Sequence, residues 1–262
     1  MPELVYPPVI AAAKTMFRVL DLKLTVEGDH HVPRTGGAVL ASNHVSYLDF
    51  IFCGLGALES RRLVRFMAKD SVFRHRVSGP LMRGMRHIPV DRRAGADSYA
   101  AAVAALRSGE VVGVFPEATI SRSFTVKEFK SGATRMAREA QVPVLPVALW
   151  GTQRLWTKGR PRTLTRRHTP ITILVGEPMD PAAYPDPTAM TEDLRTRLTA
   201  LVDRAQREYP DQPATPEDRW WLPAHLGGSA PTPQEALALD AGDRRSANPG
   251  AADLPGADRS SG

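Results

Sequence analysis

The chain has 262 residues, of which 42% are hydrophobic and 24% charged, and its formal net charge is +6. This length and composition allow one or two domains with a sizeable core. The sequence has no cysteine and histidine spacing typical of a metal site, so we expect no metal. Its single cysteine, Cys53, is consistent with a reducing compartment, and the apolar run Phe50–Cys53 places it in the core rather than in a nucleophilic role.

The first 24 residues predict an amphipathic segment with a short helix near residues 9–20. The apolar run Val9–Ala13 is followed by Lys14 and Arg18, so no uncharged stretch reaches the roughly 18 residues of a transmembrane helix. The basic residues follow the first apolar run, which is not the order of a secretory signal. We therefore expect residues 1–24 to lie peripherally on the cytoplasmic face of the plasma membrane. The alternative is a helix that only packs on the core.

The stretch Asn43–Asp49 follows the apolar run Ala38–Ala41 and carries a histidine and an acid five positions apart. On one straight helix these two side chains would point about 140° apart. His44 is therefore expected to precede a helix that has Asp49 in its first turn, with Ser46 as the N-cap. The loop then folds back, so that the carboxylate orients the imidazole of a general base. The alternative is a capping box of Ser46 and Asp49 that only starts the helix.

Two later segments, Met85–Arg93 and Val111–Thr119, also run from short apolar stretches rich in β-branched residues into polar ones. In an open α/β sheet, ligands bind outside the carboxyl ends of the strands. We therefore expect His44, Arg92 and Glu117 to converge at this edge of the sheet.

Short apolar runs that alternate with helical segments predict a single α/β domain, at residues 25–209, with a mostly parallel sheet flanked by helices. Strands are expected near residues 38–42, 64–68, 86–90, 111–115, 144–149 and 171–175. Further helices are expected near residues 46–57, 97–107, 131–141 and 191–207.

Four blocks make the chain resemble the glycerolipid acyltransferases typified by 1-acylglycerol-3-phosphate acyltransferase. They are an NHxxxxD-like block at Asn43–Asp49, an apolar-Pro-apolar-Asp-Arg block at Ile88–Arg92, a FPEGT-like block at Phe115–Thr119 and a Val-Pro-x-x-Pro-Val block at Val142–Val147. Four blocks in the family's order are far more specific than one. The resemblance implies a glycerol-3-phosphate acyltransferase-like fold.

The resemblance also implies direct transfer of an acyl chain from a thioester to a lipid hydroxyl. His44 would be the general base on the acceptor hydroxyl, and Asp49 would orient its ring. The co-substrate would be acyl-CoA or an acyl-carrier protein, with no further cofactor. The expected acceptor is 1-acylglycerol 3-phosphate, which gives phosphatidic acid. The alternatives are another lysophospholipid or polar lipid as acceptor, and a catalytically silent lipid-binding protein.

The substrate contacts implied by the resemblance follow the same blocks. Arg92 and Lys130 suit the acceptor phosphate, the first as a planar fork and the second as a point charge. Glu117 carries the sign of phosphate and suits an acceptor hydroxyl or a bound cation, with Thr119 beside it. Asn43 completes the set of substrate contacts in the first block. The structural alternatives are solvated surface for Arg92 and Lys130, and a helix cap or ion pair for Glu117.

Two residues depart from the family's third block. Ala118 replaces a glycine, which adds a methyl group and reduces freedom at positive φ, so we expect the loop to approach its ligand differently. Ile120 replaces an arginine and removes a cation from the phosphate side. Arg122, two residues further on, is our candidate for its replacement. Ala118 and Ile120 somewhat favour the alternative in which the acceptor is another lysophospholipid or polar lipid.

Residues 210–262 are rich in Pro, Ala, Gly and Asp and are expected to be disordered, except that Trp220 and Trp221 dock on the body or touch lipid. This segment holds 8 acidic and 4 basic residues, so the preceding residues carry a net charge of +10. A basic body predicts an anionic membrane as partner, with ordinary solvated surface as the alternative. Nothing resembles a nucleic-acid-binding module, so no nucleic acid is expected. The two basic clusters are Arg61, Arg62, Arg65, Lys69, Arg74 and Arg76, and Lys158, Arg160, Arg162, Arg166 and Arg167.

Overall fold

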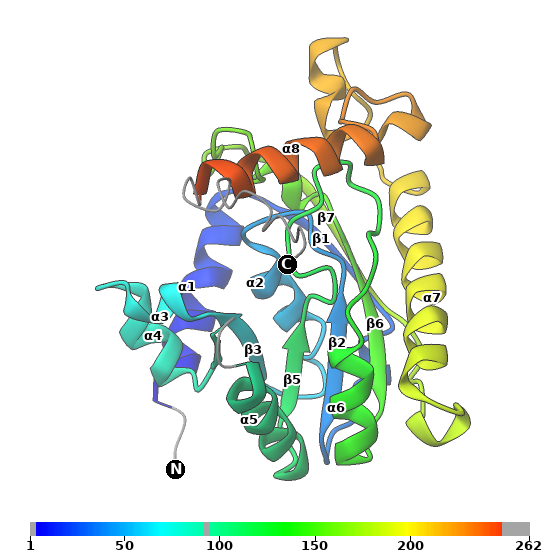
Figure 1. Cartoon of the computed structure of the whole chain (residues 1–262). Helices are drawn as coiled ribbons and strands as arrows, with labels where there is room; N and C mark the ends of the chain where they lie inside the picture. The colour runs from blue at the N-terminus through cyan, green and yellow to red at the C-terminus, as the bar shows by residue number, and fades with distance from the viewer. Residues whose placement is uncertain (1–3, 92–94, 248–262) are drawn as a thin grey trace, which may run out of the picture.

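The computed structural model describes residues 4–91 and 95–247, and a seven-stranded sheet forms its centre (Figure 1). The strands run in the order β1-β7-β6-β2-β5-β3-β4, and every neighbouring pair is parallel except β6 and β7. This arrangement confirms the predicted mostly parallel α/β sheet. The strands are β1 (Lys23–Glu27), β2 (Ala38–Ser42), β3 (Val64–Lys69), β4 (Ile88–Val90), β5 (Val111–Val114), β6 (Val144–Trp150) and β7 (Pro170–Val175).

Helices cover both faces of this sheet. The alternating side chains of β2 show the two layers, because Leu40 packs in the cluster that contains Phe17 and Phe52, whereas Val39 packs with Ala102 and with residues of two further helices. A strand buried on both faces reads as a continuous apolar run, which is why β2 was predictable. The helices are α1 (Tyr6–Val19), α2 (Asp49–Leu55), α3 (Asp70–Arg74), α4 (Ser78–Gly84), α5 (Gly95–Arg107), α6 (Gly132–Ala140), α7 (Pro187–Arg207) and α8 (Pro233–Ala247). Short 3-10 turns are η1 (Asp29–His31), η2 (Thr152–Arg154), η3 (Pro181–Ala183), η4 (Glu217–Trp221) and η5 (Ala224–Leu226).

The N-terminal helix α1 packs on the core through one face. Phe17 stacks on Phe52 of α2 with ring centroids 5.0 Å apart, and the Tyr6 hydroxyl donates to the Val64 carbonyl at 2.5 Å. Cys53 is buried in α2, as predicted. Within the described residues, no helix is long and apolar enough to cross a membrane. The predicted core-packing alternative for this segment is therefore present, and contact with a membrane stays a prediction.

The sequence did not reveal the edge strand β1 or the short helices α3 and α4. β1 is largely exposed and carries no apolar run, so it lacks the signal that identified the central strands. Helix α2 was predicted near its correct place but begins at Asp49, so Ser46 is not its N-cap. The Ser46 hydroxyl instead donates to the Trp156 carbonyl and accepts from the Leu48 amide.

The predicted disorder from Pro210 onward is wrong for residues 210–247, which contain η4, η5 and α8. Trp221 is fully buried and packs edge-on against Tyr209, with ring centroids 5.5 Å apart, so it docks on the body. The prediction rested on the average composition of the segment. An average does not reveal that one side chain, Trp221, is buried or that individual acidic residues pair with the rest of the protein. Residues 248–262 of the predicted tail lie outside the described residues.

Candidate active site

Asn43 fixes the turn that leaves β2. Its side-chain amide donates to the Leu149 carbonyl at 3.0 Å and accepts from the Leu149 amide at 2.7 Å, which ties the end of β2 to β6. The side chain is buried, and its two polar groups are used by the backbone. In this structure the Asn43 side chain holds the backbone at the end of β2, and its contact with the substrate stays a prediction.

His44 and Asp49 lie as predicted, on the two sides of the turn into α2. Nδ1 of His44 is 2.9 Å from Oδ2 of Asp49, and this carboxylate is completely buried. An ionised carboxylate only accepts hydrogen bonds, so Nδ1 carries the proton and Nε2 keeps a free lone pair. The ring stacks on Phe115 at a centroid distance of 4.2 Å, which fixes its plane, and remains 20% exposed. The His44 side chain is thus prepared to accept a proton at Nε2.

The Asp49 carboxylate is held by three further donors. The amides of Val45 and Ser46 both donate to Oδ2 at 2.7 Å, and the Thr152 hydroxyl donates to Oδ1 at 2.6 Å. The bond from the Ser46 amide to Asp49 is the one that the predicted capping box would contain, although Ser46 is not the N-cap of α2. Thr152 is a buried residue of η2, 103 positions from Asp49, and no sequence pattern pointed to it.

Glu117, in the turn that follows β5, supports the same loop. Its Oε1 accepts from the His44 backbone amide at 3.0 Å, and its Oε2 accepts from the Lys127 amide at 3.4 Å. Burial raises the pKa of this carboxyl to about 8, because desolvation outweighs the two amide donors and the nearby Lys127 charge. Glu117 and His44 therefore converge as predicted, and the carboxyl contacts the backbone of the loop that carries His44.

Comparisons with known proteins show which family of proteins the chain is similar to. The profile of the family described as Acyltransferase matches residues 23–150, which include β1 through β6 and the whole His44 turn. A 1-acyl-sn-glycerol-3-phosphate acyltransferase of Bacillus subtilis (strain 168) is 29% identical over 189 residues, which cover 68% of this chain and 88% of that protein. A protein of the same name from Borreliella burgdorferi is 27% identical and covers 56% of this chain and 59% of its own length. Residues 23–150 of the chain thus match the Acyltransferase family, and the chain is similar to glycerolipid acyltransferases.

A solved structure shares the fold of this acyltransferase. The crystal structure of the 1-acyl-sn-glycerophosphate (LPA) acyltransferase PlsC from Thermotoga maritima aligns with a TM-score of 0.66 at 23% identity. The alignment covers 78% of this chain and 81% of that chain. The predicted fold class is therefore confirmed.

The departures from the family's third block have clear positions. Ala118 is exposed at a φ of 60°, so it adopts the left-handed conformation that glycine would adopt without strain. Ile120 is buried, and Thr119 accepts a hydrogen bond from Lys127 Nζ. Arg122 faces two carboxylates of α8 rather than open solvent.

The other two predicted phosphate ligands are Lys130 and Arg92, and contact of either with a phosphate stays a prediction. Lys130 is exposed at the entrance to α6, where its amide donates to the Pro116 carbonyl, which agrees with the surface alternative. Arg92 lies outside the described residues. Lys127 and Lys158, which the sequence interpretation did not select as phosphate ligands, lie beside Arg122 through shared carboxylates.

The raised pKa of Glu117 predicts a pH dependence of stability. The carboxyl has an ordinary pKa near 4.5 and a pKa of about 8 in the folded protein, so the folded state binds its proton more tightly. Its contribution to the free energy of unfolding is therefore constant below about 4.5, falls as pH rises to about 8, and is constant above that. In Glu117→Gln this fall is expected to disappear.

Denaturant titrations of wild type and Glu117→Gln at pH 5, 6.5 and 8 check this expectation. The difference between the two proteins is the informative quantity, because the lowered pKa of His87, about 4, gives an opposite slope below about pH 6.5 in both. Parallel profiles for the two proteins would contradict a neutral Glu117 in the folded state.

Proposed function

We propose that this acyltransferase moves an acyl chain from a thioester to the free hydroxyl of 1-acylglycerol 3-phosphate and forms phosphatidic acid. The observation that supports this proposal most strongly is the contact between His44 and Asp49. The buried Asp49 carboxylate holds Nδ1 of the His44 ring, so that Nε2 is available to accept a proton. The names of the relatives from B. subtilis and B. burgdorferi support this choice of reaction.

The proposed chemistry is one direct transfer. The acceptor hydroxyl gives its proton to Nε2 of His44 while its oxygen attacks the thioester carbonyl carbon. The tetrahedral intermediate then collapses, the carbon–sulfur bond breaks, and the proton passes from the imidazolium to the leaving thiolate. The Asp49 charge stabilises the imidazolium, and general-base catalysis of this kind contributes about 10²–10⁴ in rate. The donor is acyl-CoA or an acyl-carrier protein, and the step needs no covalent acyl-enzyme.

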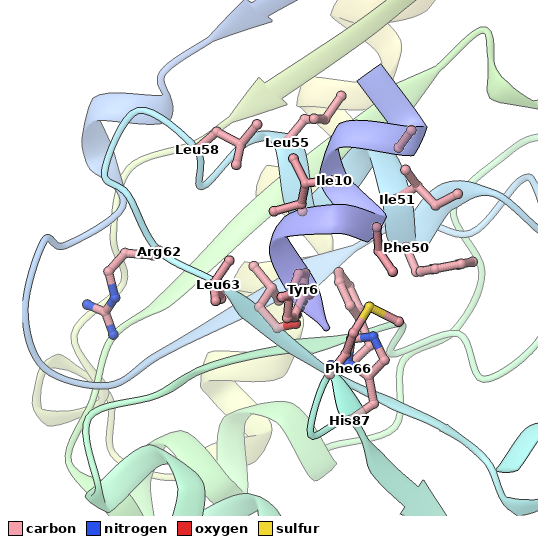
Figure 2. Close-up of a pocket in the computed structure, with 15 residues that line it drawn as sticks. Tyr6, Ile10, Phe50, Ile51, Leu55, Leu58, Arg62, Leu63, Phe66 and His87 are labelled. Atoms are coloured by element: carbon pink, nitrogen blue, oxygen red, sulfur yellow. Dashed lines mark hydrogen bonds between the residues drawn. The ribbon is translucent and has the colours of Figure 1, made fainter. Parts of the chain in front are cut away.

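An apolar pocket between α1, α2 and β3 fits the acyl chain of the donor (Figure 2). Phe50, which directly follows Asp49, and Phe66 of β3 are among the residues that line it. Phe66 stacks on Phe115 with ring centroids 6.2 Å apart, and Phe115 stacks on His44, so the aromatic wall continues to the reacting centre. The rest of the lining is Tyr6, Val9, Ile10, Ala13, Ile51, Gly54, Leu55, Leu58, Arg62, Leu63, Val64, Met85 and His87.

Gly54 offers a direct test of this pocket. Apart from its own helix, a Cβ at Gly54 would have only Phe66 within 4 Å, at 3.8 Å, so this position in the pocket lining has space for a side chain. In Gly54→Leu, kcat/KM for long-chain acyl donors is expected to fall about tenfold or more while short-chain donors are retained, because the new side chain occupies the space of the distal methylenes. The measurement is kcat/KM for donors of increasing chain length with one fixed acceptor.

Gly54→Ala is the matched control for this variant. Its methyl group makes only the 3.8 Å contact, and alanine is favoured over glycine within a helix by about 0.5–1 kcal/mol, so it should keep the chain-length preference and unfold at a higher temperature. An unchanged preference in a folded Gly54→Leu protein would place the acyl chain elsewhere.

The face around α3 and α4 supports peripheral contact with the cytoplasmic leaflet. Val72, Val77 and Leu81 are exposed there at 38%, 70% and 42%, beside the exposed Arg74 and Arg76. Apolar and basic side chains on one face are typical of a surface that lies on anionic lipid. Figure 1 shows α3 and α4 next to the first turn of α1, which also lines the pocket.

The structure removes two arginines from the predicted lipid-facing cluster. Arg65 is buried and paired with Glu110, and Arg62 donates to the carbonyls of Pro33, Gly36 and Gly109. In the second cluster, Arg166 pairs with Asp218 and Arg160 lies over the Trp220 ring. These four arginines therefore make contacts within the protein. The exposed residues around α3 and α4 are the ones that we propose to face the membrane.

A panel of acceptors tests the proposed reaction. Wild-type protein is incubated with liposomes, acyl-CoA or acyl-carrier donors, and either 1-acylglycerol 3-phosphate, a lysophospholipid with a larger headgroup, or monoacylglycerol. Products are identified by mass spectrometry. Phosphatidic acid as the main product supports the proposal, whereas a preferred product from another acceptor would keep the mechanism and overturn the assigned substrate.

A further inference from the structure

Three cations converge above the catalytic turn, and α8 supplies the carboxylates between them. Asp240 is 3.4 Å from Nε of Arg122, 3.3 Å from Nζ of Lys127 and 2.7 Å from Nζ of Lys158. Asp243 is 2.7 Å from an Nη of Arg122 and 2.8 Å from Nζ of Lys158. We call Arg122, Lys127 and Lys158 the cation cluster.

The cation cluster is connected to the catalytic turn by one side chain. The Lys127 amide donates to Glu117, whose other oxygen accepts from the His44 amide. The Lys127 ammonium also donates to the Thr119 hydroxyl in the third family block. An anion held by the cluster would therefore lie beside the loop that carries His44.

The cluster contains a hydrogen-bond donor that the two carboxylates leave unused. Nε of Arg122 is buried and has no hydrogen-bond partner among the described residues, although Asp240 lies 3.4 Å away. The planar guanidinium and two ammonium groups match a phosphate monoester, which accepts several charge-assisted hydrogen bonds. A Cβ at Gly159 would lie 2.4 Å from Nη1 of Arg122, so the glycine leaves room for this guanidinium.

Helix α8 is held mainly by charge. Asp240 is only 13% exposed, and the cations beneath it are 15–23% exposed, so the helix covers the cluster. Its apolar contacts are few, because Ala236 is buried whereas Leu237 and Leu239 are 61% and 45% exposed. Figure 1 shows α8 crossing the end of the molecule toward which β5 runs, and α8 lies outside residues 23–150 that match the family. A helix attached mainly by partly exposed ion pairs, with few apolar contacts, is held weakly and can be displaced by a competing anion.

We propose that α8 is an acidic strap whose Asp240 and Asp243 occupy the cation cluster until the phosphate of the acceptor replaces them. The inference rests on the proposed function and adds to it the residues that bind the phosphate and the segment that competes for them. Hydrogen bonds from Lys158 and Arg122 lower the pKa of Asp243 to about 2, so its carboxylate is charged at neutral pH. Binding of a phosphorylated acceptor and docking of α8 are therefore mutually exclusive.

Neutralising the strap tests the competition kinetically. In the double variant Asp240→Asn and Asp243→Asn, KM for 1-acylglycerol 3-phosphate is expected to fall about threefold to tenfold with kcat unchanged, because partly exposed ion pairs of this kind are individually weak. The matched control neutralises two exposed acids outside the strap, Glu177→Gln with Glu192→Gln, and should leave KM unchanged. If α8 only stabilises the fold, the strap variant lowers the melting temperature without lowering KM, and that result overturns the inference.

Hydrogen exchange tests the strap without any turnover. Glycerol 3-phosphate is expected to speed exchange of the backbone amides in residues 233–247 of wild type, and glycerol at equal ionic strength is not. Acceleration by glycerol 3-phosphate together with absence of acyl transfer would reject the proposed function and keep the strap. Acyl transfer to 1-acylglycerol 3-phosphate, with no acceleration and no change of KM in the double variant, would reject the strap alone.

Discussion

Replacement of His44 by alanine is expected to lower kcat by about two to four orders of magnitude, because it removes the group that accepts the proton of the acceptor hydroxyl. The ring is partly exposed and its main contacts are Asp49 and Phe115, so the fold should survive the truncation. The check is a steady-state acyl-transfer assay, together with a melting curve and vesicle binding for the same protein.

His225→Ala is the matched control for this variant. His225 is exposed in η5 and lies outside the catalytic turn, so its removal should leave kcat within about twofold of wild type. A His44→Ala protein that keeps wild-type kcat would remove His44 from the chemistry.

Replacement of Asp49 by asparagine is expected to lower kcat by a similar factor, about 10²–10⁴, with a small change in KM. The amide has nearly the shape of the carboxylate but lacks the charge that stabilises the imidazolium as it forms. It also offers one acceptor oxygen in place of two, whereas the carboxylate now receives four hydrogen bonds from the His44 ring, the Thr152 hydroxyl and the amides of Val45 and Ser46. Pre-steady-state or steady-state rates at saturating acceptor give kcat directly.

Thr152→Val separates the charge of Asp49 from its positioning. This variant removes one hydrogen bond to Oδ1 and keeps the carboxylate charge, so its loss of kcat should be clearly smaller than that of Asp49→Asn. Thr152→Ser, which keeps the hydroxyl, should restore most of the rate. Equal losses in Asp49→Asn and Thr152→Val would show that the charge itself contributes little.

The parts of the site that are local in sequence were predictable. His44 and Asp49 lie five positions apart, and helical geometry alone required the turn that the structure shows between them. The central strands were predictable because strands buried on both faces read as continuous apolar runs, as β2 does. Glu117 was placed near His44 because neighbouring parallel strands end at the same edge of the sheet.

The parts that depend on long-range contacts were not predictable. Thr152 reaches Asp49 across 103 positions, and its hydroxyl carries no pattern of its own. Asn43 was assigned to the substrate because its family block suggested so, whereas its amide is used by Leu149 of β6. The strap was missed because average composition describes a segment as a whole, while Trp221 and the pairs of Asp240 with distant cations act singly.

Formation of phosphatidic acid from 1-acylglycerol 3-phosphate is the measurement that tests the proposed activity most directly. Purified protein is given the acceptor in liposomes with acyl-CoA and, separately, with an acyl-carrier donor, and the product is quantified by mass spectrometry. We predict phosphatidic acid with at least one donor from wild type and a loss of about two to four orders of magnitude in His44→Ala. Folded wild-type protein that binds the liposomes and forms no phosphatidic acid with either donor would contradict the account.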